Sequence, residues 1–296
     1  MKVVRLPDLD EKRPRRVAVG TFDGVHVGHR EVIRGCDTVL TFDPHPLSVV
    51  RPEAAPKLIT PFTVKRDIIA GLGVDELVVI PFDDEFRTKT AEQFIDEVLV
   101  EKLGATEVSV GENFNFGKGA KGNVEMLRGR TEFETRVAPL VEVDGEAVSS
   151  TQIRALVASG DVEKAARMLG GPFIVEGEVA HGDKRGRELG YPTANLVPDE
   201  RFVHPGHGVY AAWAHGHCAA VNVGVRPQFQ TGRGLLIEAF LIGFDGDLYG
   251  ETLRVAFSKR LRGERRFESV DALVEQMGRD VTEAEGICSA ATFPAA

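Results

Sequence analysis

The 296-residue sequence is 43% hydrophobic and carries a net charge of −9, with three cysteines. A chain of this length can bury two separate hydrophobic cores. It contains no run of the roughly 18 apolar residues that a membrane helix needs, and its charged N-terminal stretch lacks the apolar core of a signal peptide. Three scattered cysteines predict a reducing compartment, with no disulfide framework and no zinc site. We therefore expect a soluble, cytoplasmic protein with no membrane partner.

The negative charge is shared almost evenly between the two halves of the chain. A nucleic-acid-binding protein would carry a basic excess, so nucleic acid is not an expected partner. The basic residues 13–16 (Arg-Pro-Arg-Arg) are interpreted as a solvated lead-in to the first strand.

Residues 17–30 (VAVGTFDGVHVGHR) predict a strand, a glycine-rich loop and the start of a helix. Glycines let the backbone approach a phosphate closely. His26 and His29 can donate hydrogen bonds to phosphoryl oxygens as charge develops on them. The alternative is an ordinary turn with two surface histidines.

The rest of the first half alternates between strands and helices, as in a parallel α/β sheet. Thr90 and Gln93 fit a capping box. By itself, the loop 111–117 (GENFNFG) fits a glycine-rich turn with two core phenylalanines as well as it fits a binding-site loop. We expect strands at 38–42, 77–80, 107–110 and 137–143, and helices at 63–72, 90–103 and 123–127.

Residues 149–154 (SSTQIR) combine three hydroxyls at an expected helix start with Arg154 one turn later, a donor set suited to phosphate. Taken alone, the segment is more simply a helix cap with a surface arginine. Helices at 153–159 and 162–169 then lead to Gly-Gly-Pro at 170–172, which ends a helix and suits a hinge. We place the domain boundary there, with domains at 1–171 and 172–296.

From residue 173 onward the apolar pattern alternates with a period of two, which predicts a small antiparallel barrel. Pro192 fixes the backbone so that Thr193 and Asn195 face one side, and their oxygens are hard ligands that suit Mg²⁺. Ordinary polar residues on a strand face are the simpler alternative. A helix at 270–281 should pack on the barrel through Val270, Leu273, Val274 and Met277. The tail that follows it, residues 282–296, is expected to be disordered.

Glu238 is the only acid in the otherwise apolar run 234–243. Burial in a pocket would raise the pKa of its carboxyl toward the working pH, as a general base requires. Strand alternation also permits the side chain to face solvent.

Three motifs resemble the signatures of one family. Residues 20–29 (GTFDGVHVGH) are similar to the HxGH signature of nucleotidyltransferases in its FDGxHxGH form, 149–154 to SSTxxR, and 186–195 (GRELGYPTAN) to the riboflavin kinase signature GRxLGxPTAN. The chain is identified as a member of the bacterial bifunctional riboflavin kinase/FAD synthetase family. The resemblance implies an α/β protein, in which a Rossmann-like nucleotidyltransferase domain with a parallel sheet precedes a small antiparallel barrel with a C-terminal helix.

The resemblance also implies two reactions. The second domain would phosphorylate riboflavin to FMN, and the first would adenylylate FMN to FAD with release of pyrophosphate. Glu238 would be the base for the riboflavin hydroxyl, Thr193 and Asn195 would hold Mg²⁺ with ATP as co-substrate, and His26, His29 and Arg154 would stabilise charge on the α-phosphorus. Further substrate- or nucleotide-binding residues are expected at Gly20, Phe22, Asp23, Gly24, Gly28, His45, Asn113, Phe114, Ser149, Ser150, Thr151, Gly182, Lys184, Gly186, Arg187, Gly190, Pro192, Asn222 and Arg226.

The segment after His29 departs from the family. Residues 30–35 allow under two helical turns where the family has a longer helix, so we expect FAD synthesis to be the weaker activity. One alternative function is a riboflavin kinase whose first domain is a weakly active or regulatory nucleotide- or flavin-binding module. Another is an RNA-binding protein, which the charge disfavours. The oligomeric state stays open.

Overall fold

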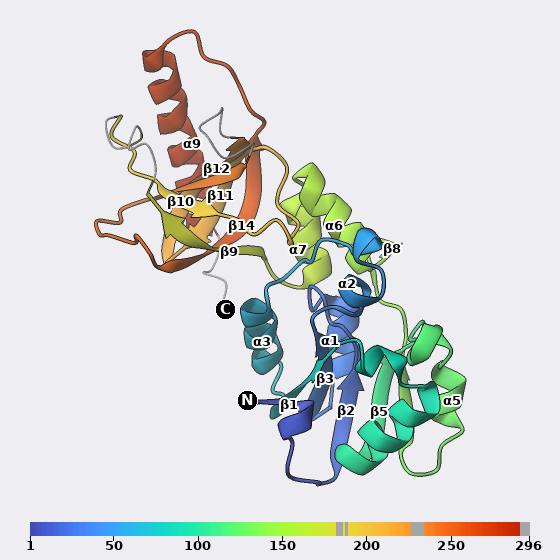
Figure 1. The fold of residues 1–296 in the computed structure, drawn as a ribbon. Helices are drawn as coiled ribbons and strands as arrows, with labels where there is room; N and C mark the ends of the chain where they lie inside the picture. Colours follow the sequence, from blue (N-terminus) through green and yellow to red (C-terminus); the bar gives the residue numbers. More distant parts are fainter. Residues whose placement is uncertain (182–185, 187–188, 226–233, 291–296) are drawn as a thin grey trace. The chain divides into compact units, whose positions relative to one another are not determined.

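The computed structural model describes residues 1–181, 186, 189–225 and 234–290. The chain forms two compact units, coloured from blue to red along the sequence in Figure 1. The first contains residues 1–56 and 65–149, and the second contains residues 57–64 together with the described residues between 150 and 290. This division groups residues 150–171 with the barrel, and the functional boundary at 171/172 stays a prediction.

Six strands form the sheet of the first unit: β1 (Lys2–Arg5), β2 (Arg15–Val19), β3 (Thr38–Asp43), β4 (Glu76–Pro81), β5 (Ala105–Gly111) and β6 (Glu134–Ala138). All neighbours pair in parallel, in the order β1-β4-β3-β2-β5-β6. The predicted parallel sheet is confirmed. The sequence pattern does not predict β1, because a four-residue edge strand with charged ends has little periodicity.

The helices of this unit are short. The β2–β3 crossover contains only α1 (Val27–Ile33), which confirms the short segment after His29. The Thr90–Gln93 capping box is present in full. A single strand at 137–143 is wrong, because β6 ends before Pro139, which has no N–H to donate. The remaining elements are η1 (Leu6–Asp8), α2 (Pro46–Val50), η2 (Pro52–Ala54), α3 (Phe62–Gly71), η3 (Phe86–Thr88), α4 (Ala91–Gln93), the π-helical η4 (Phe94–Lys102), η5 (Lys118–Ala120), α5 (Val124–Arg128) and the hairpin β7 (Glu142–Val143) and β8 (Glu146–Ala147).

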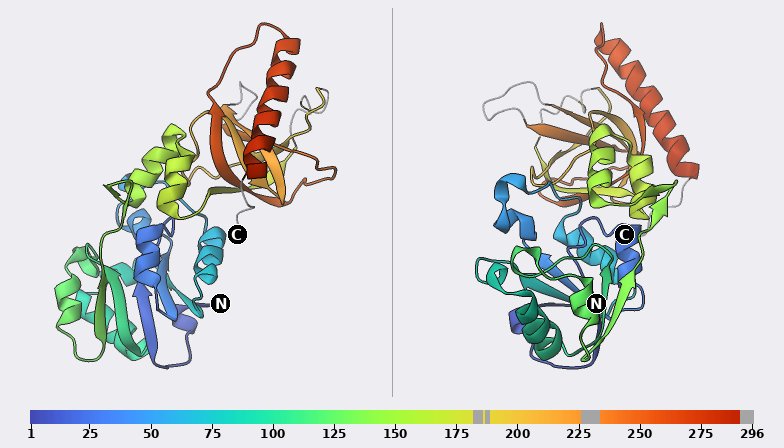
Figure 2. Two further views of the ribbon diagram at one scale, coloured as in Figure 1. Left: turned by 180° about the vertical axis from the view of Figure 1, so that it is seen from behind. Right: turned by 90° about the vertical axis from the view of Figure 1, so that its right-hand side faces the viewer.

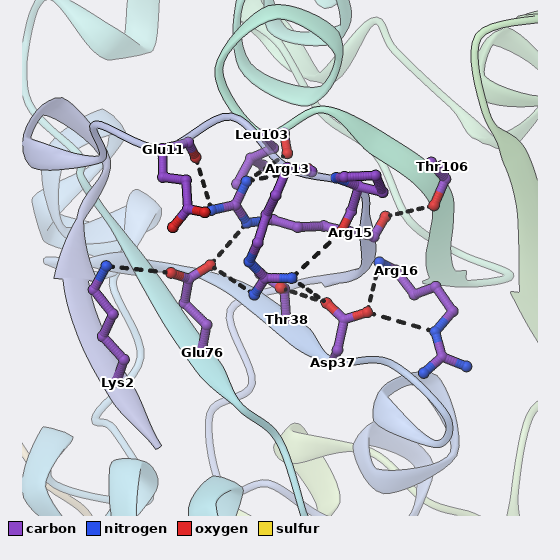
Figure 3. Close-up of polar contacts among 11 residues, drawn as sticks. Lys2, Glu11, Arg13, Arg15, Arg16, Asp37, Thr38, Glu76, Leu103 and Thr106 are labelled. Atoms are coloured by element: carbon purple, nitrogen blue, oxygen red, sulfur yellow. Dashed lines mark hydrogen bonds and ion pairs between the residues drawn. The ribbon is translucent and has the colours of Figure 1, made fainter.

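Arg15 is not the solvated lead-in that its basic neighbourhood predicts, because its side chain is fully buried at the amino end of β2. Its Nε donates to Glu76 Oε2 at 2.8 Å, and its Nη1 donates to the Leu103 carbonyl at 2.8 Å. Figure 3 shows Lys2, Arg13 and Arg15 converging on Glu76. A guanidinium can be buried when a carboxylate and carbonyls satisfy its donors. This network links the amino ends of the strands β2 and β4.

The second unit contains α6 (Ser150–Ser159), α7 (Val162–Leu169), β9 (Phe173–Ala180), β10 (Ala194–Val197), β11 (Gly208–Ala214), β12 (His217–Val225), β13 (Leu235–Leu241), β14 (Thr252–Arg262) and α9 (Val270–Ala290). Its strands form a closed barrel in the order β10-β13-β12-β11-β14-β9, with antiparallel pairing throughout. The predicted barrel with a C-terminal helix is confirmed. Helix α7 packs on β14 and β9, and both views in Figure 2 show the long α9 lying along the barrel.

Helix α9 corrects two predictions. It continues to Ala290 rather than ending at 281, since Ala284 and Cys288 extend its buried face by further turns, and most of the expected disordered tail is therefore helical. Val270 does not pack on the barrel, because it opens the helix with 62% of its surface exposed. Across the described residues, no helix is both long and apolar enough to cross a membrane.

The expectation of no disulfide is also wrong. Cys218 at the start of β12 is bonded to Cys288 near the end of α9, with a Cα–Cα distance of 5.9 Å, and Cys36 is free and buried. A separation of 70 residues hides this pair from local sequence reasoning. The cysteine count therefore no longer argues for a reducing compartment.

Two candidate active sites

The first site lies where the strand order of the sheet reverses. The chain runs from β2 through β3 to β4 on one side, and β5 and β6 then lie on the other side of β2. Ligands of open α/β sheets bind outside the carboxyl ends of the strands at such a switch point. The loops that follow β2 and β5 are the two glycine-rich segments at 20–26 and 111–117.

The two histidines form one stacked pair. His26 caps α1, and its Nδ1 accepts a hydrogen bond from the His29 backbone N–H at 3.2 Å. A neutral ring that accepts at Nδ1 carries its proton on Nε2, so His26 is set up to donate from Nε2. The ring of His29 stacks on it with centroids 3.5 Å apart, and the buried ring of Phe22 meets His29 edge-on at 5.4 Å.

His29 is held in its neutral form. Burial, the neighbouring His26 and the charge of Lys65 all lower the pKa of its imidazole well below the usual value. Its Nδ1 is enclosed and has no hydrogen-bond partner within the described part of the chain. A ligand would therefore meet His29 through the rest of its ring.

Two of the glycines serve packing as much as phosphate access. A Cβ on Gly20 would lie 3.0 Å from the Phe22 ring, and a Cβ on Gly28 would lie 3.2 Å from the His26 ring. Both positions therefore leave room for the side chains that fix the histidine pair. Between them, Asp23 is buried and Gly24 has a φ of 90°, which favours glycine.

Sequence reasoning misses Lys65, on α3, which is a buried part of this site. Its Nζ donates to the Thr21 carbonyl at 2.9 Å, and the same carbonyl accepts from Thr41 Oγ1 at 3.1 Å. The pKa of Lys65 is lowered from its usual value because burial outweighs the opposing effect of the nearby Asp23 and Asp43 charges. A lysine in a helical apolar pattern looks like a surface residue, so only its burial could have revealed it.

The other residues expected to serve adenylylation lie on α2, in the loop after β5 and around the start of α6. His45 caps α2 and accepts from the Leu47 N–H at its Nδ1, 3.2 Å away. In the loop after β5, Asn113 is exposed, and Phe114 stacks on the buried Phe116 with ring centroids 5.4 Å apart. Ser149 ends the first unit. Ser150 begins α6 in the second unit, which also carries Thr151 and Arg154.

The second site is a pocket of about 770 Å³ on the outer face of the barrel. On β13, Leu236, Glu238 and Phe240 line it, while the alternating Ile237 and Ala239 are fully buried in the barrel. Glu238 thus faces outward, as strand alternation permits, but α9, which packs on β11, β12 and β14, lines the same pocket. Glu238 is partly buried.

The polar residues of this pocket lie side by side on three neighbouring strands. Asn195 on β10 and Asn222 on β12 are each registered opposite Glu238 on β13. Asn222 Nδ2 donates to Glu238 Oε2 at 3.2 Å. Thr193 comes just before β10 and also lines the pocket, so the structure brings together the four residues expected to serve the kinase reaction.

Gly186 and Pro192 line the same pocket, and the Tyr191 N–H donates to the Gly186 carbonyl at 2.7 Å. Gly190 has a φ of 87° in the turn between them. Four of the predicted binding residues lie outside the described residues: Gly182, Lys184, Arg187 and Arg226.

Another part of the pocket is lined by α9 and by the segment that precedes it. Leu273, Met277 and Val281 are spaced four residues apart along one helix face, and Arg262 and Asp280 line the pocket beside them. Sequence reasoning predicts the packing of Leu273 and Met277 but not the role of Asp280, because a lone aspartate on a helix is usually solvated.

Comparison with known proteins agrees with this architecture. A family model described as FAD synthetase matches residues 8–152, and one described as riboflavin kinase matches residues 169–288. The chain is 36% identical to the bifunctional riboflavin kinase/FMN adenylyltransferase of Bacillus subtilis (strain 168), over 93% of each chain. It is 35% identical to the protein of the same name from Escherichia coli (strain K12), over 89% of this chain and 90% of that one.

A solved structure resembles the whole chain. It is titled as a macrolide-efflux protein from Streptococcus pneumoniae, and it matches with a TM-score of 0.85 and 30% identity over 96% of this chain and 99% of that one. The chain belongs to the family of bifunctional riboflavin kinase/FMN adenylyltransferases.

Proposed function

We propose that this chain makes both flavin cofactors: it phosphorylates riboflavin to FMN at the barrel pocket, and it adenylylates FMN to FAD, releasing pyrophosphate, at the α/β domain. The observation that carries the proposal is the register of Asn195, Glu238 and Asn222 across three strands of one pocket, in a chain whose two halves match the two enzyme families. ATP is the co-substrate of both steps. The functional domains are 1–171 and 172–296.

Glu238 is the proposed general base of the kinase reaction. Asn222 donates to one carboxylate oxygen, which orients the group and leaves the other oxygen to accept the proton of the riboflavin 5′-hydroxyl. The deprotonated hydroxyl then attacks the γ-phosphorus of ATP, the bond to the bridging oxygen breaks, and ADP leaves. Positioning and charge stabilisation account for most of the rate in such reactions.

Mg²⁺ is the proposed metal ion of this pocket, held by Thr193 and Asn195. Asn195 Nδ2 donates to the Thr193 carbonyl at 3.5 Å, so this contact does not use the amide oxygen that would bind a cation. No cluster of three or more acidic, histidine or cysteine side chains suited to a metal occurs in the described ranges. Two neutral oxygens suit an ion that keeps most of its waters and takes phosphate oxygens as ligands. When bound, it would neutralise charge on the ATP phosphates.

His26, His29 and Arg154 are the proposed catalytic residues of adenylyl transfer. The Nε2 proton of His26 and the neutral ring of His29 suit hydrogen bonding to a phosphate that gains charge while the FMN phosphate attacks the α-phosphorus of ATP. Because α1 has only seven residues, we also propose that FAD synthesis is slower than FMN synthesis. We also propose that the enzyme is located in the cytoplasm.

The test is a product profile. The protein is incubated with riboflavin and Mg-ATP, and separately with FMN and Mg-ATP, and FMN and FAD are quantified over time. Both products are expected, with FAD formed more slowly. FMN without FAD would favour a kinase with a regulatory first domain. Glu238→Gln should then remove only the first activity and His29→Ala only the second, and loss of both from one folded variant would contradict the two-site proposal.

A further inference from the structure

A buried polar network joins the elements that line the kinase pocket from α9 and from the end of β14. Asp280 on α9 is 4% exposed and accepts from two of the three guanidinium nitrogens of Arg262 at the end of β14, with Nε–Oδ1 at 3.0 Å and Nη2–Oδ2 at 2.7 Å. This bidentate pair joins helix α9 to strand β14.

Gln276, one turn earlier on α9 and 8% exposed, extends the network. Its Nε2 donates to Asp280 Oδ1 at 2.8 Å, and its Oε1 accepts from Arg265 Nη1 and from Arg279 Nη2, both at 3.1 Å. Arg265 belongs to the segment between β14 and α9. Two hydrogen-bond chains therefore run from one aspartate, to the strand and to the connecting segment.

Every anchored element contributes to the pocket. Arg262, Arg265 and Phe267 line it from the strand end and connecting segment, and Asp280 lines it from the helix between Met277 and Val281. The Arg262 guanidinium also lies over the Phe267 ring, 5.7 Å from its centroid. Displacement of α9 from β14 would move the apolar wall and both basic side chains together.

We infer that Asp280, with Arg262 and Gln276, is a positioning residue of the kinase reaction that holds α9 and the segment 262–267 in the arrangement that binds riboflavin. None of the three residues is proposed to take part in phosphate transfer. Loss of the network should therefore weaken riboflavin binding more than it slows the chemical step. This inference rests on the proposed kinase activity.

A neighbouring ion pair supplies a matched control. Glu275 and Arg279 pair four residues apart on the same helix, with exposed fractions of 72% and 58%, and neither lines the pocket. Glu275→Gln removes a carboxylate from α9 but leaves Asp280 unchanged and keeps Arg279, whose Nη2 donates to Gln276 Oε1 at 3.1 Å. An exposed pair contributes little to stability.

The test measures kcat and KM for riboflavin in the full chain carrying Asp280→Asn, Arg262→Gln, both changes, or Glu275→Gln. Removing one partner of a buried ion pair leaves the other unsatisfied, so each single variant should raise the riboflavin KM about tenfold or more, with kcat changed about twofold or less. The riboflavin KM of the double variant should be no higher than that of the more impaired single variant, since both changes break the same interaction. Glu275→Gln should match the unmodified protein.

Conversion of FMN to FAD, measured on the same samples, reports whether the first domain is intact. If Asp280→Asn prevents the barrel from folding, Gln276→Met decides, because it cuts the link to Arg265 and keeps the Arg262–Asp280 pair; a threefold or greater rise in riboflavin KM is expected. The inference is overturned by an unchanged KM in a folded variant, by a loss confined to kcat, by additive single effects, or by an equal effect of Glu275→Gln. Absence of kinase activity in the unmodified protein would instead refute the proposed function.

Discussion

Asn222 donates a hydrogen bond from Nδ2 to Oε2 of Glu238 across adjacent strands β12 and β13, at 3.2 Å. The amide satisfies one oxygen of the carboxylate and sets the direction of the other. Glu238→Gln removes the proton acceptor but keeps the shape and this contact. FMN formation should fall by about 10²–10⁴-fold, the usual size of general-base catalysis, while FAD formation from supplied FMN is unchanged. Equal kinase rates in the two proteins would exclude Glu238 as the base.

Thr193→Val tests the proposed magnesium ligand. Valine keeps the shape of threonine and deletes one hard oxygen, so the KM for Mg-ATP should rise and the kinase rate should fall. Riboflavin binding, followed by the change in its fluorescence, should persist because the flavin does not require that oxygen. Unchanged ATP kinetics would mean that the hydroxyl only precedes a strand.

His29 should make the stability of the first unit depend on pH. Burial, His26 and Lys65 lower the pKa of His29 in the folded state, whereas in the unfolded chain it titrates near the usual value of 6.5. As the pH falls below that value, the unfolded state binds a proton that the folded state does not, and stability is lost. The free energy of unfolding of the unmodified protein should therefore fall more steeply than that of His29→Gln between pH 6.5 and 5, by up to about 1 kcal/mol per pH unit. Parallel curves from urea titrations would contradict this.

Lys65→Met should impair FAD synthesis alone. Methionine has a similar length but cannot donate to the Thr21 carbonyl or balance Asp23, so the loop that carries the histidine pair loses a contact at 2.9 Å. A displacement of about 1 Å can cost on the order of a hundredfold in rate, and a fall of at least about tenfold is expected. Lys12→Met, at an exposed lysine of the same unit, is the control and should have no effect. The kinase rate of both variants should match that of the unmodified protein.

Glu76→Gln should destabilise the first unit without altering its chemistry. Three cations, Lys2, Arg13 and Arg15, pair with this one carboxylate, and Arg15 is fully buried. Breaking a buried pair from one side typically costs about 3–5 kcal/mol. The melting temperature should drop, while kcat for FAD formation at a temperature where the variant is folded stays the same. A lower kcat without a lower melting temperature would indicate a functional role for the network.

The sequence alone was sufficient for features that depend on local pattern. Apolar runs separated by helical segments predict the parallel sheet, and a switch to a period of two predicts the barrel. Local hydrogen bonding likewise identifies the Thr90–Gln93 capping box. His26, His29, Thr193 and Glu238 are candidates because the motifs around them resemble the family's signatures, and their roles stay predictions.

What depends on partners far away in the chain was decided only by the tertiary structure. Arg15 looks solvated among its basic neighbours, yet Glu76, sixty-one residues later, makes its burial possible. The disulfide of Cys218 with Cys288, the role of Lys65 and the Arg262–Asp280 pair are equally non-local. For Glu238, strand alternation only permits the side chain to leave the barrel interior. Whether it then meets water or a pocket depends on α9, whose packing no local pattern around Glu238 can encode.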